Sequence, residues 1–252
     1  MKKIAIVTGA SSGMGREFII QMSRKYPSLE EIWVIARRQE RLRELEKQMK
    51  NIRIRAFVLD LKEKNSFEVI RAALCKEKPR VGILVNSAGF GISGPFENLS
   101  EEEIDGMVEL NCNALTKITR IVLPYMGKGT QIYQIASSAA FCPQPGFSAY
   151  AATKAYVLSF SLALRQEIGK KGMKVTAVCP GPVKTEFFDT AYKYEEMKFY
   201  KKLAMADPKK VAAKALKDGR KNKAVSVYGI TMQIVRFFCR ICPTELIVKL
   251  IY

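Results

Sequence analysis

The sequence of 252 residues contains no histidine. This absence excludes a Ser-His-Asp triad, a Cys-His nucleophile pair and any metal site that needs an imidazole ligand. Proton transfer near neutral pH must then come from tyrosine, lysine, cysteine or a carboxyl group whose pKa is shifted. We predict no metal site.

Long hydrophobic runs are also missing. No segment approaches the roughly 18 apolar residues of a membrane span, and the apolar run behind Lys2 and Lys3 is too short for the core of a signal peptide. The cysteines are scattered, and the Cys-x-x-Cys pair formed by Cys239 and Cys242 is interpreted as two thiols on one apolar helix face. We therefore expect a cytoplasmic protein that needs no disulfides.

Acidic residues are few beside basic ones. The chain has 42 Lys and Arg against 24 Asp and Glu, which gives a net charge of +18. This charge predicts an anionic partner, and a phosphate cofactor, a lipid headgroup, an acidic protein and nucleic acid all fit. Residues 193–223 alone hold eleven basic and four acidic residues, a net of +7. We interpret that stretch as a solvated helix face, with docking of an acidic carrier protein or of an anionic membrane as the alternatives.

Short apolar segments alternate with helix-like stretches along most of the chain. Strands are expected at 4–8, 32–36, 52–59, 81–85, 131–136 and 174–179, and helices at 16–25, 41–49, 66–75, 101–126 and 149–168. Such regular alternation predicts an α/β fold, a Rossmann-type doubly wound parallel sheet flanked by helices.

The regularity ends after Pro180. Beyond it we expect a substrate lid over 186–206, a helix over 207–219 and an apolar extension over 224–252. These segments are interpreted as a C-terminal helical cap on the same single domain, residues 1–252.

A glycine-rich turn follows the first strand and opens the first helix. Its spacing is G-x-x-x-G-x-G, which differs from the usual dinucleotide fingerprint G-x-G-x-x-G. Glycines let the backbone turn sharply and approach a pyrophosphate, whose charge the helix N-terminus stabilises. We assign this role to Gly9, Ser11, Ser12, Gly13, Met14 and Gly15.

The end of the second strand indicates which dinucleotide is bound. NAD-binding folds usually place an acidic residue about 20 positions further on, to hold the ribose 2′-hydroxyl. This chain has Ala36 there, followed by Arg37 and Arg38. Two guanidinium groups favour NADP(H) over NAD(H), with Arg37 as the preferred contact and a merely basic helix start as the alternative. Asp60 and Leu61, after the third strand, are expected to meet the adenine.

Tyr150 and Lys154 stand at i and i+4 of an expected helix, so they share one face. An ammonium beside a phenol favours the phenolate and is expected to lower its pKa from about 10. Ser137 lies upstream, where the fifth strand ends and the ligand crevice of a parallel sheet opens. Its hydroxyl can bind a carbonyl oxygen, and the adjacent Ser138 is the alternative.

These motifs resemble, in order and spacing, those of the short-chain dehydrogenase/reductase family. The resemblance covers roughly residues 3–190 and is closest to the branch of bacterial ketoreductases and hydroxysteroid and fatty-acyl ketoreductases. The motifs that carry it are Thr8–Gly15, Asn86-Ser87-Ala88-Gly89, Asn111, Ser137, Tyr150-x-x-x-Lys154 and Pro180-Gly181-Pro182-Val183-Lys184-Thr185. Ser87 departs from the pattern, because the family usually has a second asparagine there.

The resemblance implies a role for each matching residue. Tyr150 would be the general acid in reduction and the base in oxidation, while Lys154 would lower its pKa and hold the nicotinamide ribose. Ser137 would position the substrate oxygen, and Asn111 would support a water that relays protons to Lys154. Further cofactor contacts are implied for Asn86, Ala88, Gly89, Pro180, Gly181, Val183 and Thr185.

The expected lid is rich in aromatic residues, which suggests a bulky apolar substrate such as a steroid, an acyl chain or an aromatic ketone. The residues concerned are Phe187, Phe188, Tyr192, Tyr194, Met197, Phe199 and Tyr200, with Phe90, Phe96, Phe141 and Phe147 beside the motif loops. Simple packing of the cap is the alternative.

The apolar tail over 229–252 is expected to pack on the core or on a second subunit of a homodimer or homotetramer, in preference to peripheral membrane contact. The leading hypothesis is an NADP(H)-dependent carbonyl reductase or alcohol dehydrogenase. A catalytically idle NADP(H) sensor and an acyl-carrier-linked 3-oxoacyl reductase are the alternatives. Nucleic acid is not expected as a partner, because no reading motif accompanies the charge.

Overall fold

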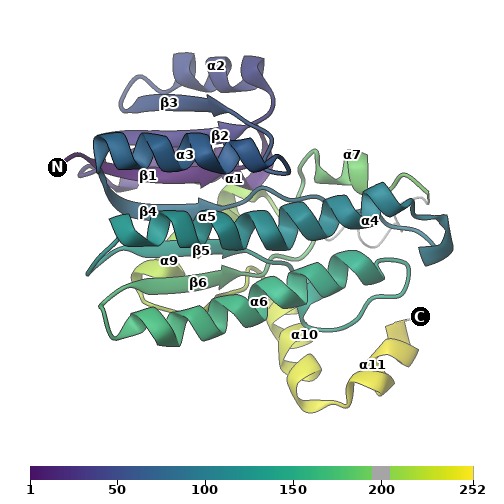
Figure 1. Cartoon of the computed structure of the whole chain (residues 1–252). Helices are drawn as coiled ribbons and strands as arrows, with labels where there is room; N and C mark the ends of the chain where they lie inside the picture. Colours follow the sequence, from purple (N-terminus) through teal and green to yellow (C-terminus); the bar gives the residue numbers. More distant parts are fainter. Residues whose placement is uncertain (195–204, 252) are drawn as a thin grey trace.

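Apolar strands pair side by side into a parallel sheet at the centre of the molecule. The computed structural model describes residues 1–194 and 205–251, with side chains through Lys249. Its seven strands follow the order β3-β2-β1-β4-β5-β6-β7. They are β1 (Lys3–Thr8), β2 (Glu31–Ala36), β3 (Arg53–Val58), β4 (Arg80–Asn86), β5 (Gln131–Ile135), β6 (Lys174–Val178) and β7 (Val225–Ser226). The predicted doubly wound sheet is confirmed (Figure 1).

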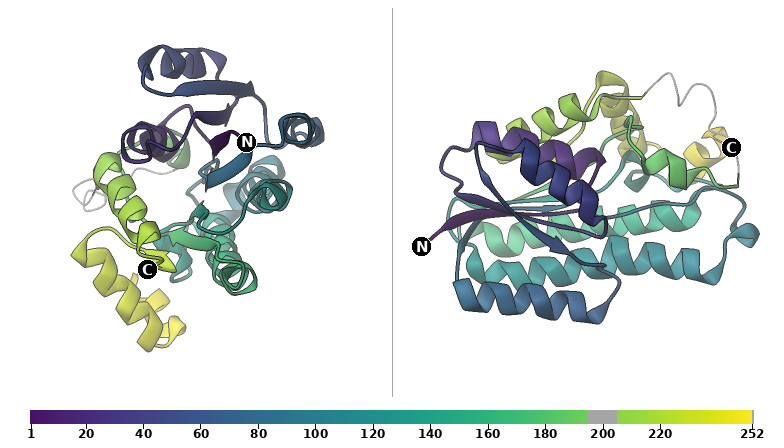
Figure 2. Two further views of the ribbon diagram at one scale, coloured as in Figure 1. Left: turned by 90° about the vertical axis from the view of Figure 1, so that its left-hand side faces the viewer. Right: turned by 90° about the horizontal axis from the view of Figure 1, so that it is seen from above.

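Helices cover both faces of the sheet, as the views in Figure 2 show. They are α1 (Gly13–Lys25), α2 (Gln39–Gln48), α3 (Lys64–Glu77), α4 (Glu101–Val108), α5 (Leu115–Val122), α6 (Ser148–Gly169), α7 (Phe187–Ala191), α9 (Pro208–Arg220), α10 (Ile230–Ile241) and α11 (Thr244–Ile251). Short 3-10 turns occur at Phe96–Asn98, Leu123–Tyr125 and Ser138–Ala140.

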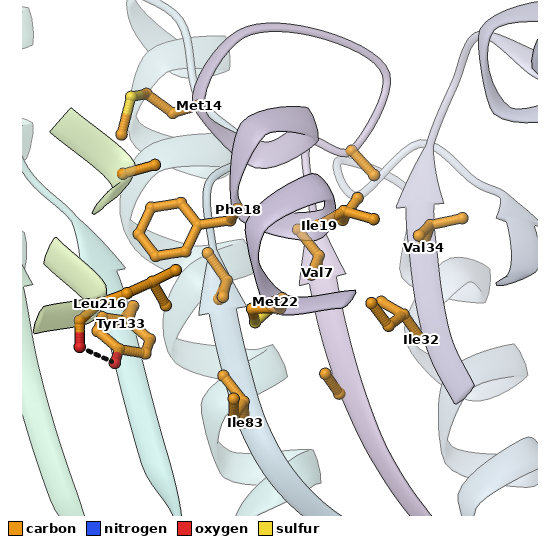
Figure 3. Packing of buried hydrophobic residues seen from close by; sticks show 14 of the residues in the cluster. Val7, Met14, Phe18, Ile19, Met22, Ile32, Val34, Ile83, Tyr133 and Leu216 are labelled. Carbon is orange, nitrogen blue, oxygen red and sulfur yellow. Dashed lines mark hydrogen bonds between the residues drawn. The ribbon is translucent and has the colours of Figure 1, made fainter. Parts of the chain in front are cut away.

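Alternate residues of each strand enter different cores. Ala5 and Val7 of β1 face the cluster made with α1, α2 and α9, while Ile4 and Ile6 face the cluster made with α3, α5 and α6. Figure 3 shows the first cluster, where Phe18 of α1 packs against Tyr133 of β5 with ring centres 5.3 Å apart. Burial on both faces explains why the central strands β1, β2 and β4 are almost unbroken apolar runs.

The helix predicted over 101–126 forms, but it is not uniform. Ser100 caps its start, and the side chains and backbones of Ser100 and Glu103 bond reciprocally as a capping box. Between α4 and α5, residues Glu109–Ala114 widen into a π-helical turn. Such turns are common at functional sites, and this one carries Asn111.

The C-terminal third differs from the predicted helical cap. Val225 and Ser226 join β6 as the seventh strand, and α9 packs beside α1, so both belong to the covered sheet. The two-residue strand has too little sequence to carry an alternating pattern, which is why it was not predicted.

Helices α10 and α11 lie at the lower right of Figure 1, apart from the helices that cover the sheet. None of the residues of α10 is fully buried in this chain, and Ile230 is 77% exposed. The predicted packing of this tail on the core is therefore only slight. Cys239 lies on α10 but Cys242 follows its end and is exposed, so the two thiols do not share a helix face. Among the described residues, no helix is both long and apolar enough to cross a membrane.

Candidate active site

A cavity of about 600 Å³ opens at the carboxyl ends of the strands, the side on which α7 lies in Figure 1. The chain order reverses between β1 and β4, and open α/β sheets bind ligands at this switch point. The cavity gathers most of the predicted site residues: Gly9, Ser11, Ser12, Gly13, Met14, Arg37, Arg38, Asp60, Leu61, Ala88, Gly89, Ser137, Tyr150, Lys154, Pro180, Gly181, Val183 and Thr185. Gly15, Asn86 and Asn111 do not line it.

Two walls of the cavity can be distinguished. The loop wall consists of Gly9, Ser11–Met14, Ala36–Arg38, Asp60, Leu61 and Ser87–Gly89. The lid wall consists of Phe187, Phe188, Thr190, Tyr192, Met232, Val235 and Cys239. Tyr150, Lys154 and Ser137 also line the same cavity.

The glycine-rich turn has the backbone that its spacing predicts. Gly9 and Gly13 have φ angles of +65° and +53°, a region that favours glycine. A Cβ at Gly9 would lie 2.7 Å from the backbone nitrogen of Ala88, and one at Gly15 would collide with the carbonyl oxygen of Gly9. The turn therefore needs glycine to bring β1, α1 and the end of β4 together. The missing side chain of Gly15 lets the first turn of α1 pack against the backbone of Gly9.

Thr8 fixes this turn to the neighbouring strand. Its Oγ1 accepts hydrogen bonds from the backbone amides of Ser87 and Ala88, both at 3.1 Å. The first turn of α1 faces the cavity through Gly13 and Met14. A tight backbone, serine hydroxyls and a helix N-terminus form a cradle of the kind that binds a pyrophosphate, so the residues present fit a dinucleotide.

Arg38 is the better-placed guanidinium at the end of β2. Its nitrogens donate to the hydroxyls of Ser11 and Ser12, with Nη2 to Ser12 Oγ at 2.7 Å, and Nη1 bonds Glu186 at 2.6 Å. Arg37 instead pairs with Asp60 at 3.5 Å and is two-thirds exposed. The preference for Arg37 over Arg38 thus finds no support in the geometry.

The two asparagines outside the cavity hold loops in place. Asn86 donates to Thr119 of α5 and to Gln134 of β5, both at 2.9 Å. Asn111 is fully buried, accepts from the backbone nitrogen of Phe90 at 3.1 Å and donates to its oxygen at 2.8 Å. The π-helical turn presents Asn111 to the Gly89–Phe90 backbone, where a Cβ at Gly89 would lie 3.4 Å from Lys154 Nζ. The water relay through Asn111 stays a prediction.

Helix α6 places Tyr150 and Lys154 together as expected. Tyr150 is 6% exposed, stacks on Phe147 with ring centres 4.3 Å apart, and meets Phe187 of the lid wall at 5.4 Å. Lys154 Nζ lies 5.6 Å from the centre of the Tyr150 ring and donates to the carbonyl oxygen of Ile135 at 2.9 Å.

Ser137 is held by its own turn. Its Oγ accepts a hydrogen bond from the amide of Ala139 at 3.1 Å, and its backbone begins the Ser138–Ala140 turn. The Ser137 hydroxyl also interacts with the Tyr150 phenol, so the two groups face the same part of the cavity. Ser138 also lines the cavity.

Burial controls the titration of both α6 groups. It raises the pKa of the Tyr150 phenol above its ordinary value, and the neighbouring Ser137 hydroxyl offsets part of that rise. Burial also lowers the pKa of Lys154 to about 8, against an opposing effect of the Cys112 and Cys179 thiols. Burial disfavours the phenolate, and this effect is the largest one on the pKa of Tyr150 in this structure. The expected lowering of that pKa by Lys154 stays a prediction.

The segment after β6 closes the cavity. The oxygen of Pro180 accepts from the amide of Ser138 at 2.8 Å, and Thr185 Oγ1 bonds the oxygen of Val183 at 3.3 Å. The Thr185 methyl carbon would lie 3.3 Å from a Cβ at Gly13, so this segment rests on the glycine-rich turn. Residues 182–184 bond back to Ala206, which returns the chain to the sheet.

Only part of the expected aromatic lid lines the cavity. Phe187, Phe188 and Tyr192 do so, together with Phe90 and Phe147. Tyr194 bonds Glu103 outside it, Phe96 is exposed, and Phe141 lies beneath Arg236. Met197, Phe199 and Tyr200 lie outside the described residues.

Other lining residues were not predicted as site residues. Met232, Val235 and Cys239 project from α10 into the cavity, and Cys142, Gln144 and Glu186 complete its rim. Met232, Val235 and Cys239 have the i, i+3, i+7 spacing of one helix face in the sequence. This spacing predicts a shared face, but it does not predict that the face lines the cavity.

The family model for short chain dehydrogenases matches residues 3–196. The chain belongs to this family. It is 35% identical over 204 residues to the NADP-dependent 3-hydroxy acid dehydrogenase YdfG of Escherichia coli (strain K12), covering 77% of this chain and 79% of that protein. The predicted family membership is confirmed.

Solved structures of short-chain dehydrogenases share the fold. The enzyme of Sphingobium yanoikuyae in complex with NADPH is 27% identical, with a TM-score of 0.78 over 90% of this chain and 87% of that one. The bulky-bulky ketone specific alcohol dehydrogenase of Comamonas testosteroni is 25% identical, with a TM-score of 0.76 over 95% and 92%. The chain is therefore a short-chain dehydrogenase/reductase, an oxidoreductase acting on CH–OH groups, and its family uses a nucleotide cofactor and a small-molecule substrate.

Proposed function

We propose that this short-chain dehydrogenase is an NADP(H)-dependent oxidoreductase that interconverts a ketone and a secondary alcohol on a bulky apolar substrate. One observation carries the proposal: the buried Tyr150 lines the same cavity as the loop wall, which fits a dinucleotide, and its ring contacts Phe187 of the aromatic lid wall. Both are parts of one cavity of about 600 Å³, which falls in the range of small-molecule sites.

Arg38 supports the choice of NADP(H). Its guanidinium lies over the serine hydroxyls of the glycine-rich turn, and Ala36 leaves no carboxylate at the end of β2 to repel a 2′-phosphate. Arginine binds phosphate through several parallel N–H groups. The Sphingobium neighbour is in complex with NADPH, and the Escherichia coli relative is NADP-dependent by name.

The protein side of the reaction is a proton transfer at the substrate oxygen. A nicotinamide, when bound, supplies or accepts the hydride. The raised pKa of Tyr150 keeps its phenol protonated near neutral pH, so Oη can donate a proton to the ketone oxygen during reduction. Ser137 Oγ donates a hydrogen bond to the same oxygen.

Lys154 acts through its charge. With a pKa of about 8 it is mostly an ammonium at pH 7, and it faces the Tyr150 ring at 5.6 Å. There it stabilises the phenolate that remains after Tyr150 gives up its proton, because charges interact strongly in a dry site. Alcohol oxidation uses the same groups in reverse.

The lid wall favours an apolar substrate over a small acid. Phe187, Phe188 and Met232 supply apolar surface, and among the described lining residues the only basic groups are Arg37, Arg38 and Lys154. The lid wall as defined above contains no basic side chain that could bind a substrate carboxylate. The Comamonas neighbour, specific for bulky-bulky ketones, supports this choice. The name of the Escherichia coli relative supports a 3-hydroxy acid as the second candidate.

The test is a panel of initial rates of NADPH and NADH oxidation against a steroid ketone, an aromatic ketone, a free and a carrier-linked 3-oxoacyl chain, and a short 3-oxo acid. We expect kcat/KM to be at least about tenfold higher with NADPH, and higher for the steroid or aromatic ketone than for the short acid. Preference for the short acid or for NADH would overturn the corresponding half of the proposal. Binding of NADPH without turnover of any substrate would indicate the idle sensor instead, and a preference for the carrier-linked chain the 3-oxoacyl reductase. Cytoplasmic location and homo-oligomerisation stay predictions.

A further inference from the structure

Glu186 places a carboxylate where the loop wall and the lid wall meet. Oε2 accepts from Arg38 Nη1 at 2.6 Å, and Oε1 lies 3.6 Å from Arg41 Nη2. These two guanidinium groups hold the pKa of Glu186 below its ordinary value, and the Ser12 hydroxyl contributes. Glu186 is therefore a charged group in an otherwise basic corner of the cavity.

We propose that Glu186 is a built-in anion in the 2′-phosphate subsite of the cofactor site, and that it reduces the preference of this enzyme for NADP(H) over NAD(H). The proposal rests on the proposed function only in placing the adenine ribose at Arg38. It adds a residue that acts against the preference which Arg38 creates.

The argument is one of shared donors. A phosphate at Arg38 needs donors that Glu186 now engages, namely Arg38 Nη1 and the Ser12 hydroxyl, and charge-assisted bonds of this kind are the strong ones. A 2′-phosphate must therefore displace the carboxylate or bind next to a like charge. A ribose 2′-hydroxyl carries no charge and avoids this competition, so the carboxylate acts selectively against the phosphorylated cofactor.

The position of Glu186 in the chain extends the consequence to the lid. It directly precedes α7, whose Phe187 lies 5.4 Å from the Tyr150 ring. Its pairing with Arg38 of the loop wall and with Arg41 of α2 holds the residue that precedes the lid wall in place. If a phosphate displaces the Glu186 carboxylate, the residue next to Phe187 loses these ion pairs, and Phe187 contacts Tyr150.

The experiment measures dissociation constants of NADP⁺ and NAD⁺ by calorimetry for the full chain and for Glu186→Gln. Loss of the charge is expected to tighten NADP⁺ binding about tenfold, or about 1.4 kcal/mol, and to leave NAD⁺ binding within about twofold. Glu40→Gln is the matched control, because Glu40 is an exposed carboxylate of α2 near Arg38 in the chain and should change neither constant. Glu186→Ala removes the charge and also the hydrogen-bonding amide that Glu186→Gln retains, and it should act in the same direction.

Each outcome decides a separate point. Unchanged or weaker NADP⁺ binding in Glu186→Gln would overturn the inference and make Glu186 a support for Arg38. Equal tightening of NADP⁺ and NAD⁺ would also overturn it, as a general charge effect. The cofactor preference in the proposed function is tested separately, by the ratio of the NADP⁺ and NAD⁺ dissociation constants of the wild-type protein. A wild-type protein that prefers NAD⁺ would contradict that preference, and a gain of NADP⁺ affinity in Glu186→Gln would still support this inference.

Discussion

The loop wall and the lid wall border the same cavity but are built on different principles. The loop wall depends on backbone conformation and hydrogen bonds. It contains glycines with positive φ, the hydrogen bonds that Thr8 accepts from Ser87 and Ala88, and those that Arg38 donates to two serines. The lid wall depends on shape, with aromatic rings and α10 side chains and few polar groups. Binding a constant ligand requires fixed geometry, whereas a substrate wall needs only a complementary apolar surface.

This difference predicts that the two walls respond to different probes. Changes in the loop wall should act on dinucleotide affinity and leave the ranking of substrates unchanged. Changes in the lid wall should act on KM for the ketone and leave dinucleotide affinity unchanged. A variant that altered both to the same extent would break the distinction.

The largest effect is expected from Gly9→Ala. At φ +65° the new Cβ would lie 2.7 Å from the Ala88 nitrogen, so either the turn or the β4 loop must move. We expect calorimetry to detect no dinucleotide binding, and the free energy of unfolding to fall by about 1–3 kcal/mol. Gly127→Ala is the control, because a Cβ there meets nothing within 4 Å. Normal binding in Gly9→Ala would show that the turn is not the cofactor cradle.

Arg38→Gln should have the next largest effect. It removes the guanidinium that bonds Ser11, Ser12 and Glu186. We expect the dissociation constant of NADP⁺ to rise at least about tenfold, because hydrogen bonds to charged groups contribute roughly 1.5–3 kcal/mol, with NAD⁺ little changed. Arg37→Gln is the paired variant and should have the smaller effect. A larger loss in Arg37→Gln would restore the choice made from the sequence.

A pH dependence should follow from Lys154. Its pKa of about 8 means that the ammonium is present below that pH and is lost as the pH rises through it. We expect kcat/KM for ketone reduction to fall up to about tenfold per pH unit above pH 8. Lys154→Arg keeps its charge throughout this range, so any residual activity should lose the fall. An unchanged profile in that variant would assign the titration to another group.

The smallest effect is expected on the lid wall. Phe187→Ala removes one aromatic face from the Tyr150 pocket, and Met232→Ala shortens an α10 side chain that reaches Gly181. We expect KM for a bulky ketone to rise about five- to tenfold in each, the lower end of the roughly 1–3 kcal/mol that a methylene-sized change in an apolar pocket is worth. Calorimetry should find dinucleotide binding unaltered. Phe96→Ala, at an exposed ring outside the cavity, is the control.

The sequence predicted the positions of the loop wall and of the Tyr150–Lys154 pair well because their requirements are local. The glycine spacing, the paired arginines after β2 and the i, i+4 relation of Tyr150 and Lys154 each depend on a few neighbouring residues. The alternation of apolar runs with helix-like stretches likewise predicted a doubly wound parallel sheet, since parallel strands need helical crossovers.

The features that the sequence did not predict share a different physical origin. The choice between Arg37 and Arg38 depends on which side chain the turn of α2 directs toward Ser12, a contact across 26 positions. The pKa of Tyr150 depends on how deeply α6, the lid and Phe147 bury it, which spacing alone does not give. The part played by α10 depends on a helix from the C-terminal end meeting Gly181, and the seventh strand has only two residues.

Tyr150 belongs to neither wall, and the proposed chemistry depends on it most directly. The decisive measurement is the rate of NADPH oxidation with a bulky aromatic ketone by Tyr150→Phe, with NADPH affinity measured by calorimetry in the same preparation. The account predicts a loss of about 10²–10⁴ in kcat, the usual contribution of a general acid, with NADPH affinity unchanged within about twofold. Retention of the wild-type rate by Tyr150→Phe, with NADPH bound normally, would contradict it.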